Sequence, residues 1–192
     1  FVCEPFTLNT SKKKVTSMAD MQGLKIRSSG AVQSATVKAL GGSPVTMPIT
    51  EVYTSMEKGV LDGVVTAFTA MVSFRIYDVS KYSINAGLTA TPMAVAMNQK
   101  KWDSLPKDIQ AIMERINERY IFESAREYDK DRVKAIEKGK SLGKEIYALS
   151  AAEQKKWEQT FAPIYDNWVK DMNSKGLPGQ EMLDAVRQLQ GK

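Results

Sequence analysis

The sequence predicts an α/β fold with a parallel-rich sheet flanked by helices. Two observations carry this prediction. Short apolar runs alternate with helix-like segments through the first half of the chain, and a very long amphipathic pattern follows them. Strands that alternate with helices of this length form crossover units and a parallel sheet buried on both faces. In such sheets, ligands sit beyond the carboxyl ends of the strands.

The first half of the chain contains three expected strands and three expected helices. The strands cover residues 24–28, 43–48 and 61–68, and the helices cover residues 31–40, 50–59 and 69–80. Gly41 and Gly42 end the first of these helices, as glycine commonly does. The double glycine lacks the surrounding spacing of a phosphate-binding loop, so we interpret it as a cap.

The middle of the chain is expected to be extended over residues 82–98, with residues 93–97 (MAVAM) as its clearest strand. Pro106 then suits the first turn of a helix, where its missing N–H costs nothing. Apolar residues follow at helical spacing, and the pattern continues to Gly139 or Gly143. A helix of this length exceeds the usual globular range and is expected to span more than one lobe.

The last part of the chain is expected to hold a short strand at residues 144–150 and two helical regions. Ser150 and Glu153 form an S-x-x-E pattern that predicts a capping box. A stripe of apolar residues from Trp157 to Met172 is the pattern of a helix that buries one face. Pro163 predicts a kink, and a final helix is expected at residues 180–189.

Composition excludes several chemistries. The chain has 192 residues and a formal charge of +5, with 43% hydrophobic and 26% charged residues, which is typical of one large or two small globular domains. With no histidine, a Ser-His-Asp or Cys-His nucleophile cannot be built, and Cys3 alone forms no internal disulfide or thiolate cluster. Because the chain starts with Phe1 and shows no signal-peptide pattern, we expect it to be processed, trimmed or incomplete.

Two other classes of protein find little support. The Lys12–Lys14 run lacks interleaved aromatics, and charges of both signs alternate over residues 127–132, which is typical of a solvated helix face. We therefore expect no nucleic-acid partner. An enzyme with paired carboxylates remains an alternative, although no acidic pair has a distinctive spacing.

Arg27 places a charge at the end of the expected strand 24–28. A guanidinium is a planar fork of donors that meets a carboxylate with two parallel hydrogen bonds. The residue-level pattern leaves two interpretations open. Arg27 either holds the carboxylate of a ligand, or extends to water or a local acid from the strand end.

Several ordered motifs carry a resemblance that runs from Phe6 to the last helices. They are DMQGLKIRSSG, KALGGSPVTMPITEVYTSMEKGVLDGVV, YDVSKY and MNQKKWDSLPKDIQ. With these motifs the sequence resembles the solute-binding proteins of TRAP transporters, the tripartite ATP-independent periplasmic carriers for organic acids. The resemblance implies a periplasmic-binding-protein-like lobe and a long inter-lobe helix, in a family with two lobes, hinge strands and a cleft.

On this basis we expect four regions in the chain. Residues 1–22 form a hinge strand and connector, and residues 23–81 form the α/β core of the second lobe. Residues 82–143 hold inter-lobe strands and the long helix, and residues 144–192 hold a C-terminal strand and helices that pack on the second lobe. Most of the first lobe would lie outside this sequence.

The resemblance also implies site residues. Arg27 matches the family's carboxylate-binding arginine. Thr66 and Phe68 would suit a monocarboxylate with an aromatic or short aliphatic body, although Phe68 could simply fill the core. Ser28 and Ser29 could donate hydrogen bonds to the carboxylate or cap the next helix. Arg75 could supply a second positive charge or be exposed.

Two departures from the family pattern bear on the identity of the ligand and on metal binding. Residues 64–67 (VVTA) replace the Q-E-N-P of sialic-acid-binding members, which argues against that ligand. Phe68 and Thr69 replace a tryptophan-glutamate pair that is linked in some members to a cation, so we expect no metal, and we expect no cofactor.

The resemblance implies a periplasmic binder that is not an enzyme. It would capture a small organic acid, with a monocarboxylate favoured, and deliver it to the TRAP membrane permease. The alternative is a ligand-sensing domain of the same architecture that reports to a signalling partner.

Overall fold

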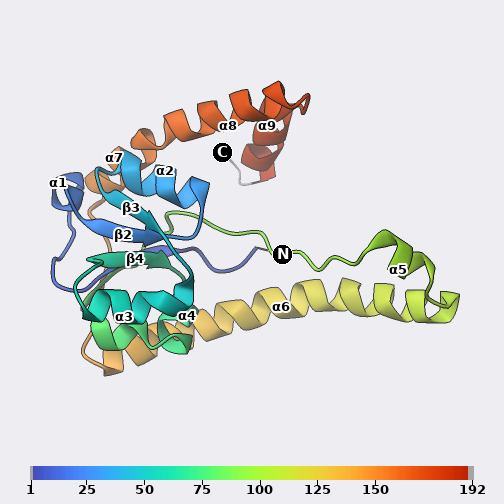
Figure 1. The fold of residues 1–192 in the computed structure, drawn as a ribbon, viewed down its shortest axis with the longest axis horizontal. Helices are drawn as coiled ribbons and strands as arrows, with labels where there is room; N and C mark the ends of the chain where they lie inside the picture. The colour runs from blue at the N-terminus through green and yellow to red at the C-terminus, as the bar shows by residue number, and fades with distance from the viewer. Residues whose placement is uncertain (1, 190–192) are drawn as a thin grey trace.

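The computed structural model describes residues 2–189, which build a six-stranded sheet with helices on both faces (Figure 1). The strands are β1 (Thr7–Thr10), β2 (Lys25–Ser28), β3 (Ser43–Thr46), β4 (Gly63–Thr66), β5 (Tyr82–Ile84) and β6 (Glu145–Tyr147), in the spatial order β3-β2-β4-β1-β5-β6. The α/β fold with a parallel-rich sheet is therefore confirmed.

One strand runs against the others. The pairs β2–β3, β2–β4 and β5–β6 are parallel, whereas β1 is antiparallel to both β4 and β5. The register pairs Thr7 with Thr66 and Asn9 with Val64. Strand β1 thus joins two parallel groups, and the five other strands all end at the same edge of the sheet.

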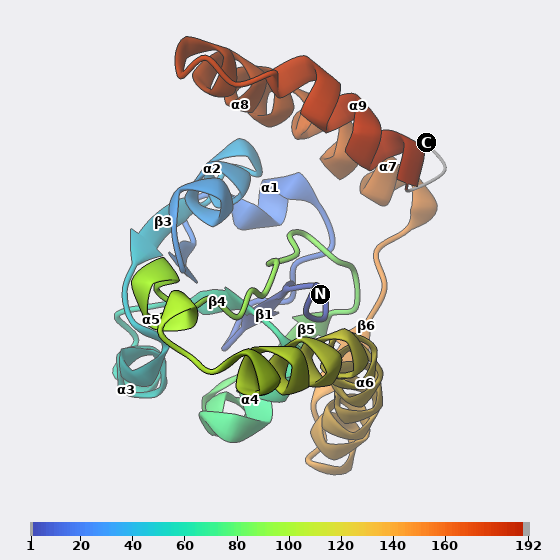
Figure 2. The same cartoon turned by 90° about the vertical axis from the view of Figure 1, so that its right-hand side faces the viewer.

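The helices divide into two layers, one on each face of the sheet (Figures 1 and 2). Helices α1 (Met18–Met21), α2 (Ala31–Ala39) and α7 (Ala151–Thr160) cover one face. Helices α3 (Val52–Glu57), α4 (Phe68–Ser73) and α6 (Lys107–Ser141) cover the other. Each layer has its own apolar core: Met21, Ile26, Val37 and Trp157 lie in the first, and Val52, Val64, Phe68 and Tyr77 lie in the second.

Helix α2 ends with the glycine cap that the sequence predicts. Gly41 adopts a positive φ of 91°, and the N–H groups of Gly41 and Gly42 donate to the carbonyl oxygens of Lys38 and Val37 at 3.0 Å. This arrangement satisfies the last carbonyls of α2.

The expected long helix is confirmed as α6, which has 35 residues. Its C-terminal half packs against the sheet layer, where Gly139 allows close approach: a Cβ at this position would lie 2.7 Å from Cζ of Tyr77. Its N-terminal half extends beyond the sheet, next to the short helix α5 (Gln99–Asp103) (Figure 1). There the stripe residues Ile109, Ile112, Ile116 and Tyr120 are exposed.

Residues 93–97 do not form the expected strand, so this prediction was wrong. The nearest strand-like contact is an isolated bridge between Val2 and Pro92, and Val95 is 91% exposed. A strand needs a neighbouring strand to accept its backbone hydrogen bonds, and among residues 2–189 no strand pairs with this segment.

The expected helix at residues 69–80 is divided in two. Helix α4 ends at Ser73, and a 3₁₀ helix, η2 (Ile76–Val79), follows Arg75, which has a positive φ of 55°. Another 3₁₀ turn, η1 (Ile49–Glu51), precedes α3. Phe68 begins α4 and does not end a strand, because β4 stops at Thr66.

The C-terminal helices turn away from the sheet. The expected kink is a break at Phe161 between α7 and α8 (Ala162–Ser174), with Pro163 in the first turn of α8, and α9 (Gly179–Leu189) folds back beside α8 (Figure 2). The apolar stripe is buried at Trp157, but Tyr165 is 47% exposed, so the expected burial fails in α8. No helix in the described chain is long and apolar enough to span a bilayer.

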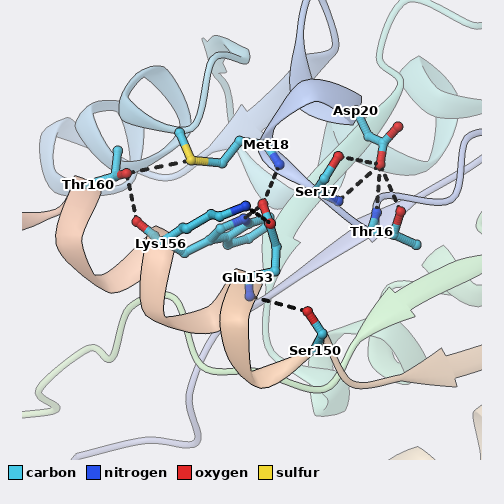
Figure 3. Close-up of polar contacts among 9 residues, drawn as sticks. Thr16, Ser17, Met18, Asp20, Ser150, Glu153, Lys156 and Thr160 are labelled. Carbon is cyan, nitrogen blue, oxygen red and sulfur yellow. Dashed lines mark hydrogen bonds and ion pairs between the residues drawn. The ribbon is translucent and has the colours of Figure 1, made fainter.

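Glu153 fastens α7 to α1, as Figure 3 shows. Only half of the expected capping box forms: the N–H of Glu153 donates to Oγ of Ser150 at 3.2 Å. The Glu153 carboxylate instead accepts the N–H of Met18 at 2.8 Å and Nε1–H of Trp157 at 3.2 Å. The hydrogen bond from Met18 is the main reason that the pKa of Glu153 lies below its ordinary value.

We predict that Glu153→Gln lowers the thermal unfolding midpoint at pH 7, because it removes a charged acceptor from the N-terminus of α1. A pKa lowered by folding stabilises the protein above the ordinary pKa of glutamate, and this contribution is lost as the pH falls below it. The difference in melting temperature between wild type and variant should therefore shrink at about pH 3. Glu158→Gln, at an exposed position of the same helix, is the control and should change little at either pH. A difference that stays constant with pH would contradict this role.

Candidate functional site

The candidate site lies at the edge of the sheet where the parallel strands end. Ser28, Thr66 and Ile84 are the last residues of β2, β4 and β5. Because β2 and β4 are neighbours and run in the same direction, the residues at their ends lie side by side. The register pairs Arg27 with Val64, so Thr66, two residues further along β4, lies diagonally across from Arg27 on the neighbouring strand.

Arg27 is a buried cation without a carboxylate partner in the described part of the chain. It is 6% exposed, and its Nε donates to the carbonyl oxygen of Met47 at 2.9 Å. Among the described residues, no carboxylate lies within ion-pair distance of its guanidinium. Burial lowers the pKa of Arg27, but an arginine side chain keeps its proton in proteins. Arg27 therefore offers its terminal N–H groups, charged and largely desolvated, at the strand ends.

Thr66 and Phe68 follow each other closely but have different environments. Thr66 is 3% exposed, and its hydroxyl makes no hydrogen bond within the described chain. Phe68 is completely buried in the core beneath α4, with Met71 and Ile76. This packing gives Phe68 a core role, and a ligand would touch its ring only after neighbouring side chains had moved. Its expected contact with a ligand stays a prediction.

The two serines have different environments. The Ser28 hydroxyl is buried and lies 2.7 Å from the hydroxyl of Ser34. Ser29 is exposed, and its N–H donates to Oε1 of Gln33 at 2.8 Å. Neither serine caps α2 with its side chain, since Gly30 is the N-cap residue. That capping interpretation was wrong, and ligand contacts from either serine stay predictions.

Arg75 forms an ion pair with Asp78, three residues further along the chain. Its Nε and Nη2 donate to Oδ2 of Asp78 at 3.0 and 2.8 Å, and its guanidinium lies 5.7 Å from the centre of the Tyr53 ring. The ion pair with Asp78 raises the pKa of Arg75. Its side chain is 76% exposed, which agrees with the second of the two expectations for this residue.

Two hollows open near the ends of β2 and β4. One, of about 260 Å³, is lined by residues that follow β2 and by residues 89–92. The other, of about 490 Å³, is lined by Thr69 and by α6 residues, among them Tyr120, Glu127 and Asp131. Arg27 is not among the residues that line either hollow.

Sequence analysis missed three residues at this edge: Glu4, Asn85 and Arg132. Arg132 lies in the stretch 127–132 that was interpreted as a solvated face. Its guanidinium instead lies 5.8 Å from the centre of the Phe68 ring. The distance from its Nε to Oε2 of Glu4 is 4.0 Å. No local signal marked these residues, because 128 positions separate Glu4 from Arg132. The rest of that stretch does follow the expectation, with exposed Lys130–Glu127 and Lys134–Asp131 pairs nearby.

The described residues contain no group of three Cys, Asp or Glu side chains placed to hold a metal ion. Arg27, Arg132 and Glu4 are buried or partly buried charged groups near the edge, and the carboxylates of Glu127 and Asp131 line the larger hollow. Burial and the Glu4 charge also raise the pKa of the neighbouring Tyr77 phenol well above its ordinary value. The arrangement can therefore bind an anion through Arg27.

Comparison with known proteins gives a consistent result. The model of the bacterial extracellular solute-binding protein family 7 matches residues 6–171. The C4-dicarboxylate-binding periplasmic protein DctP of Rhodobacter capsulatus is 28% identical over 187 residues, covering 95% of this chain and 54% of that protein. The 2,3-diketo-L-gulonate-binding periplasmic protein YiaO of Escherichia coli is 28% identical over 186 residues, covering 95% and 55%.

Solved structures agree with the fold. A marine metagenome TRAP solute-binding protein specific for aromatic acids, in complex with metahydroxyphenylacetate, has a TM-score of 0.90 at 26% identity, over 98% of this chain and 61% of that one. A TRAP periplasmic solute-binding protein of Bordetella bronchiseptica with bound mandelate has a TM-score of 0.87 at 25% identity, over 97% and 60%.

The chain spans about half the length of the curated relatives that it matches. The family model nevertheless matches most residues of this chain. The long helix and parallel-rich sheet of the chain also agree with the fold of the solved TRAP proteins. The chain belongs to the bacterial extracellular solute-binding protein family 7, the solute-binding proteins of TRAP transporters.

Proposed function

We propose that this chain is part of an extracytoplasmic solute-binding subunit that captures a small organic acid by its carboxylate and delivers it to a TRAP membrane permease. It binds its ligand without changing it chemically. A monocarboxylate with an aromatic or short aliphatic body is the favoured ligand.

The observation that carries the proposal is the unpaired charge of Arg27. Placing a charged group in a protein interior is costly unless an opposite charge or hydrogen bonds compensate. The carbonyl of Met47 supplies one hydrogen bond, and among the described residues no anion is placed to supply more. A carboxylate from solution would complete the pair with two parallel hydrogen bonds.

The two solved neighbours support the choice of a monocarboxylate, whereas the curated relative DctP is named for C4-dicarboxylates. Metahydroxyphenylacetate and mandelate, bound to the two solved neighbours, are acids with one carboxylate and an aromatic ring. In this chain, the other arginine at the edge is already matched by Glu4, which leaves one cation for one carboxylate. The periplasmic relatives likewise support an extracytoplasmic location.

A stability measurement tests whether Arg27 is held for a ligand. We predict that Arg27→Met changes the free energy of unfolding of the ligand-free protein by no more than about 1 kcal/mol, because the lost hydrogen bond is offset by removal of an unpaired buried charge. Arg132→Met is the matched comparison and should be clearly more destabilising, because it strands the Glu4 carboxylate. Urea denaturation measures both. A loss of about 3 kcal/mol in Arg27→Met would contradict the proposal, since it would indicate a structural partner.

A binding measurement tests the ligand class directly. Calorimetric titration of the natural polypeptide that contains residues 1–192 should show binding of mandelate or 3-hydroxyphenylacetate and none of mandelamide, which keeps the ring but has no carboxylate charge. Succinate provides the dicarboxylate comparison. Arg27→Lys should weaken binding about 10- to 100-fold, because an ammonium cannot reproduce the planar fork.

The control for this titration is Lys25→Gln, which removes an exposed cation two residues away on the same strand. It should bind as the wild type does. Equal affinity in Arg27→Lys and wild type would show that Arg27 does not hold the acid.

A further inference from the structure

Two segments of the chain leave the sheet together at the site edge. Residues 2–6 lead into β1, and residues 85–92 follow β5. They run antiparallel, with the N–H of Phe6 donating to the carbonyl of Thr89 at 2.7 Å and the N–H of Leu88 donating to that of Phe6 at 2.9 Å. In Figure 1 both pass the end of the sheet near the label N. We call these two segments the crossing segments; together with α6, they connect the sheet to the part of the chain that lies beyond this edge.

The first crossing segment carries a completely buried carboxylate. The side chain of Glu4 is 0% exposed, and its oxygens accept the N–H groups of Phe68 at 3.2 Å and of Thr69 at 2.9 Å. Glu4 thereby binds the first turn of α4, directly after the end of β4. Two backbone hydrogen bonds compensate part of the cost of burying this charge, and a cation supplies the remainder.

That cation is Arg132 of α6, and it contacts both crossing segments. Its Nε lies 4.0 Å from Oε2 of Glu4 in the first segment, and its Nη2 donates to Oδ1 of Asn85 in the second at 2.7 Å. The guanidinium also lies over the Phe68 ring. Its Nε is buried and makes no hydrogen bond, so the contact with Glu4 is ionic. One side chain from the long helix thus joins both crossing segments to α4.

We propose that Arg132 is a positioning residue that ties the two crossing segments to α6, fixes how they leave the sheet, and thereby raises the affinity of the Arg27 site without touching the ligand. The clause on affinity rests on the proposed function. The clause on the segments does not, because it follows from the contacts of Glu4 and Asn85.

The geometry also explains why an arginine is needed. A guanidinium presents donors in several directions in one plane, so it can face Glu4 and Asn85 at once while its charge lies over the Phe68 ring. A lysine would keep the charge, but its ammonium would bind one of the two oxygens at a time. Arg132→Lys is therefore a conservative variant that separates charge from the ability to join the segments.

Hydrogen exchange measured by mass spectrometry tests the structural clause. In Arg132→Gln, amide exchange in the peptides that cover residues 2–6 and 85–92 should accelerate about tenfold, while exchange in β2 and β3 stays as in wild type. Arg132→Lys should give an intermediate acceleration. The control is Lys134→Gln, which removes a neighbouring exposed cation of α6 and should change neither region.

Two results would overturn this clause. Unchanged exchange in the crossing segments of Arg132→Gln would show that they are held without it. Acceleration spread equally over the whole sheet would show a general loss of stability and no local tie. The double variant Glu4→Gln/Arg132→Gln adds a check, because two residues that act as a pair should give no further acceleration beyond Arg132→Gln alone.

Calorimetric titration with mandelate tests the affinity clause in the same natural polypeptide. Arg132→Lys should bind about 5- to 20-fold more weakly than wild type, whereas Lys134→Gln should bind equally. Equal affinity in Arg132→Lys would overturn the affinity clause. Failure of the wild type to bind any acid of the panel would instead count against the proposed function, and the exchange measurement would still decide the role of Arg132.

Discussion

The constraint on which the site depends is a buried positive charge that faces no anion within residues 2–189. Arg27 lies at the end of β2, nearly covered, with one hydrogen bond to a backbone carbonyl. Arg27 stays buried despite this cost because strand β2 is paired on both sides, with β3 and β4, and cannot move to bring the side chain into water. A site that is electrostatically incomplete in the free protein gains most from a ligand that completes it.

The two arginines at the edge have identical side chains but different roles, because their neighbouring residues differ. Arg132 faces the buried Glu4 carboxylate and therefore has an anionic partner within the chain. Arg27 faces no carboxylate among the described residues and remains open to an acid from outside. Strand β2 and helix α6 place the two arginines near the same edge, and the position of Glu4, in the segment that leads into the antiparallel strand β1, determines which arginine faces a carboxylate. Ligand binding and the arrangement of the crossing segments thus depend on one distribution of charge.

The local parts of the fold could be predicted from the sequence because their signals are local. The strands at Lys25–Ser28 and Gly63–Thr66, the glycine end of α2 and the length of α6 all follow from apolar periodicity and terminal residues. Residues 93–97 were misassigned because a strand depends on a neighbour, and alternating apolar residues do not reveal whether one is present. Glu153 was assigned to its own helix, whereas its carboxylate caps α1, more than 130 positions away in sequence.

The site residues, too, could be predicted where the signal is local and could not where it depends on distant parts of the chain. Arg27 could be identified from its place at a strand end together with a resemblance carried by its motif. Glu4, Asn85 and Arg132 could not, because their meeting depends on the insertion of β1 between β4 and β5, which no short pattern encodes. Phe68 was expected at the end of a strand, but β4 stops two residues earlier and the ring turns into the core.

The most direct measurement is a crystal structure of the natural polypeptide with mandelate. The account predicts that both carboxylate oxygens lie about 2.7–2.9 Å from the terminal nitrogens of Arg27, in a fork-to-fork arrangement. An acid bound in the hollow beside Ser29 and residues 89–92, with the Arg27 guanidinium still contacting only the carbonyl of Met47, would contradict the central claim.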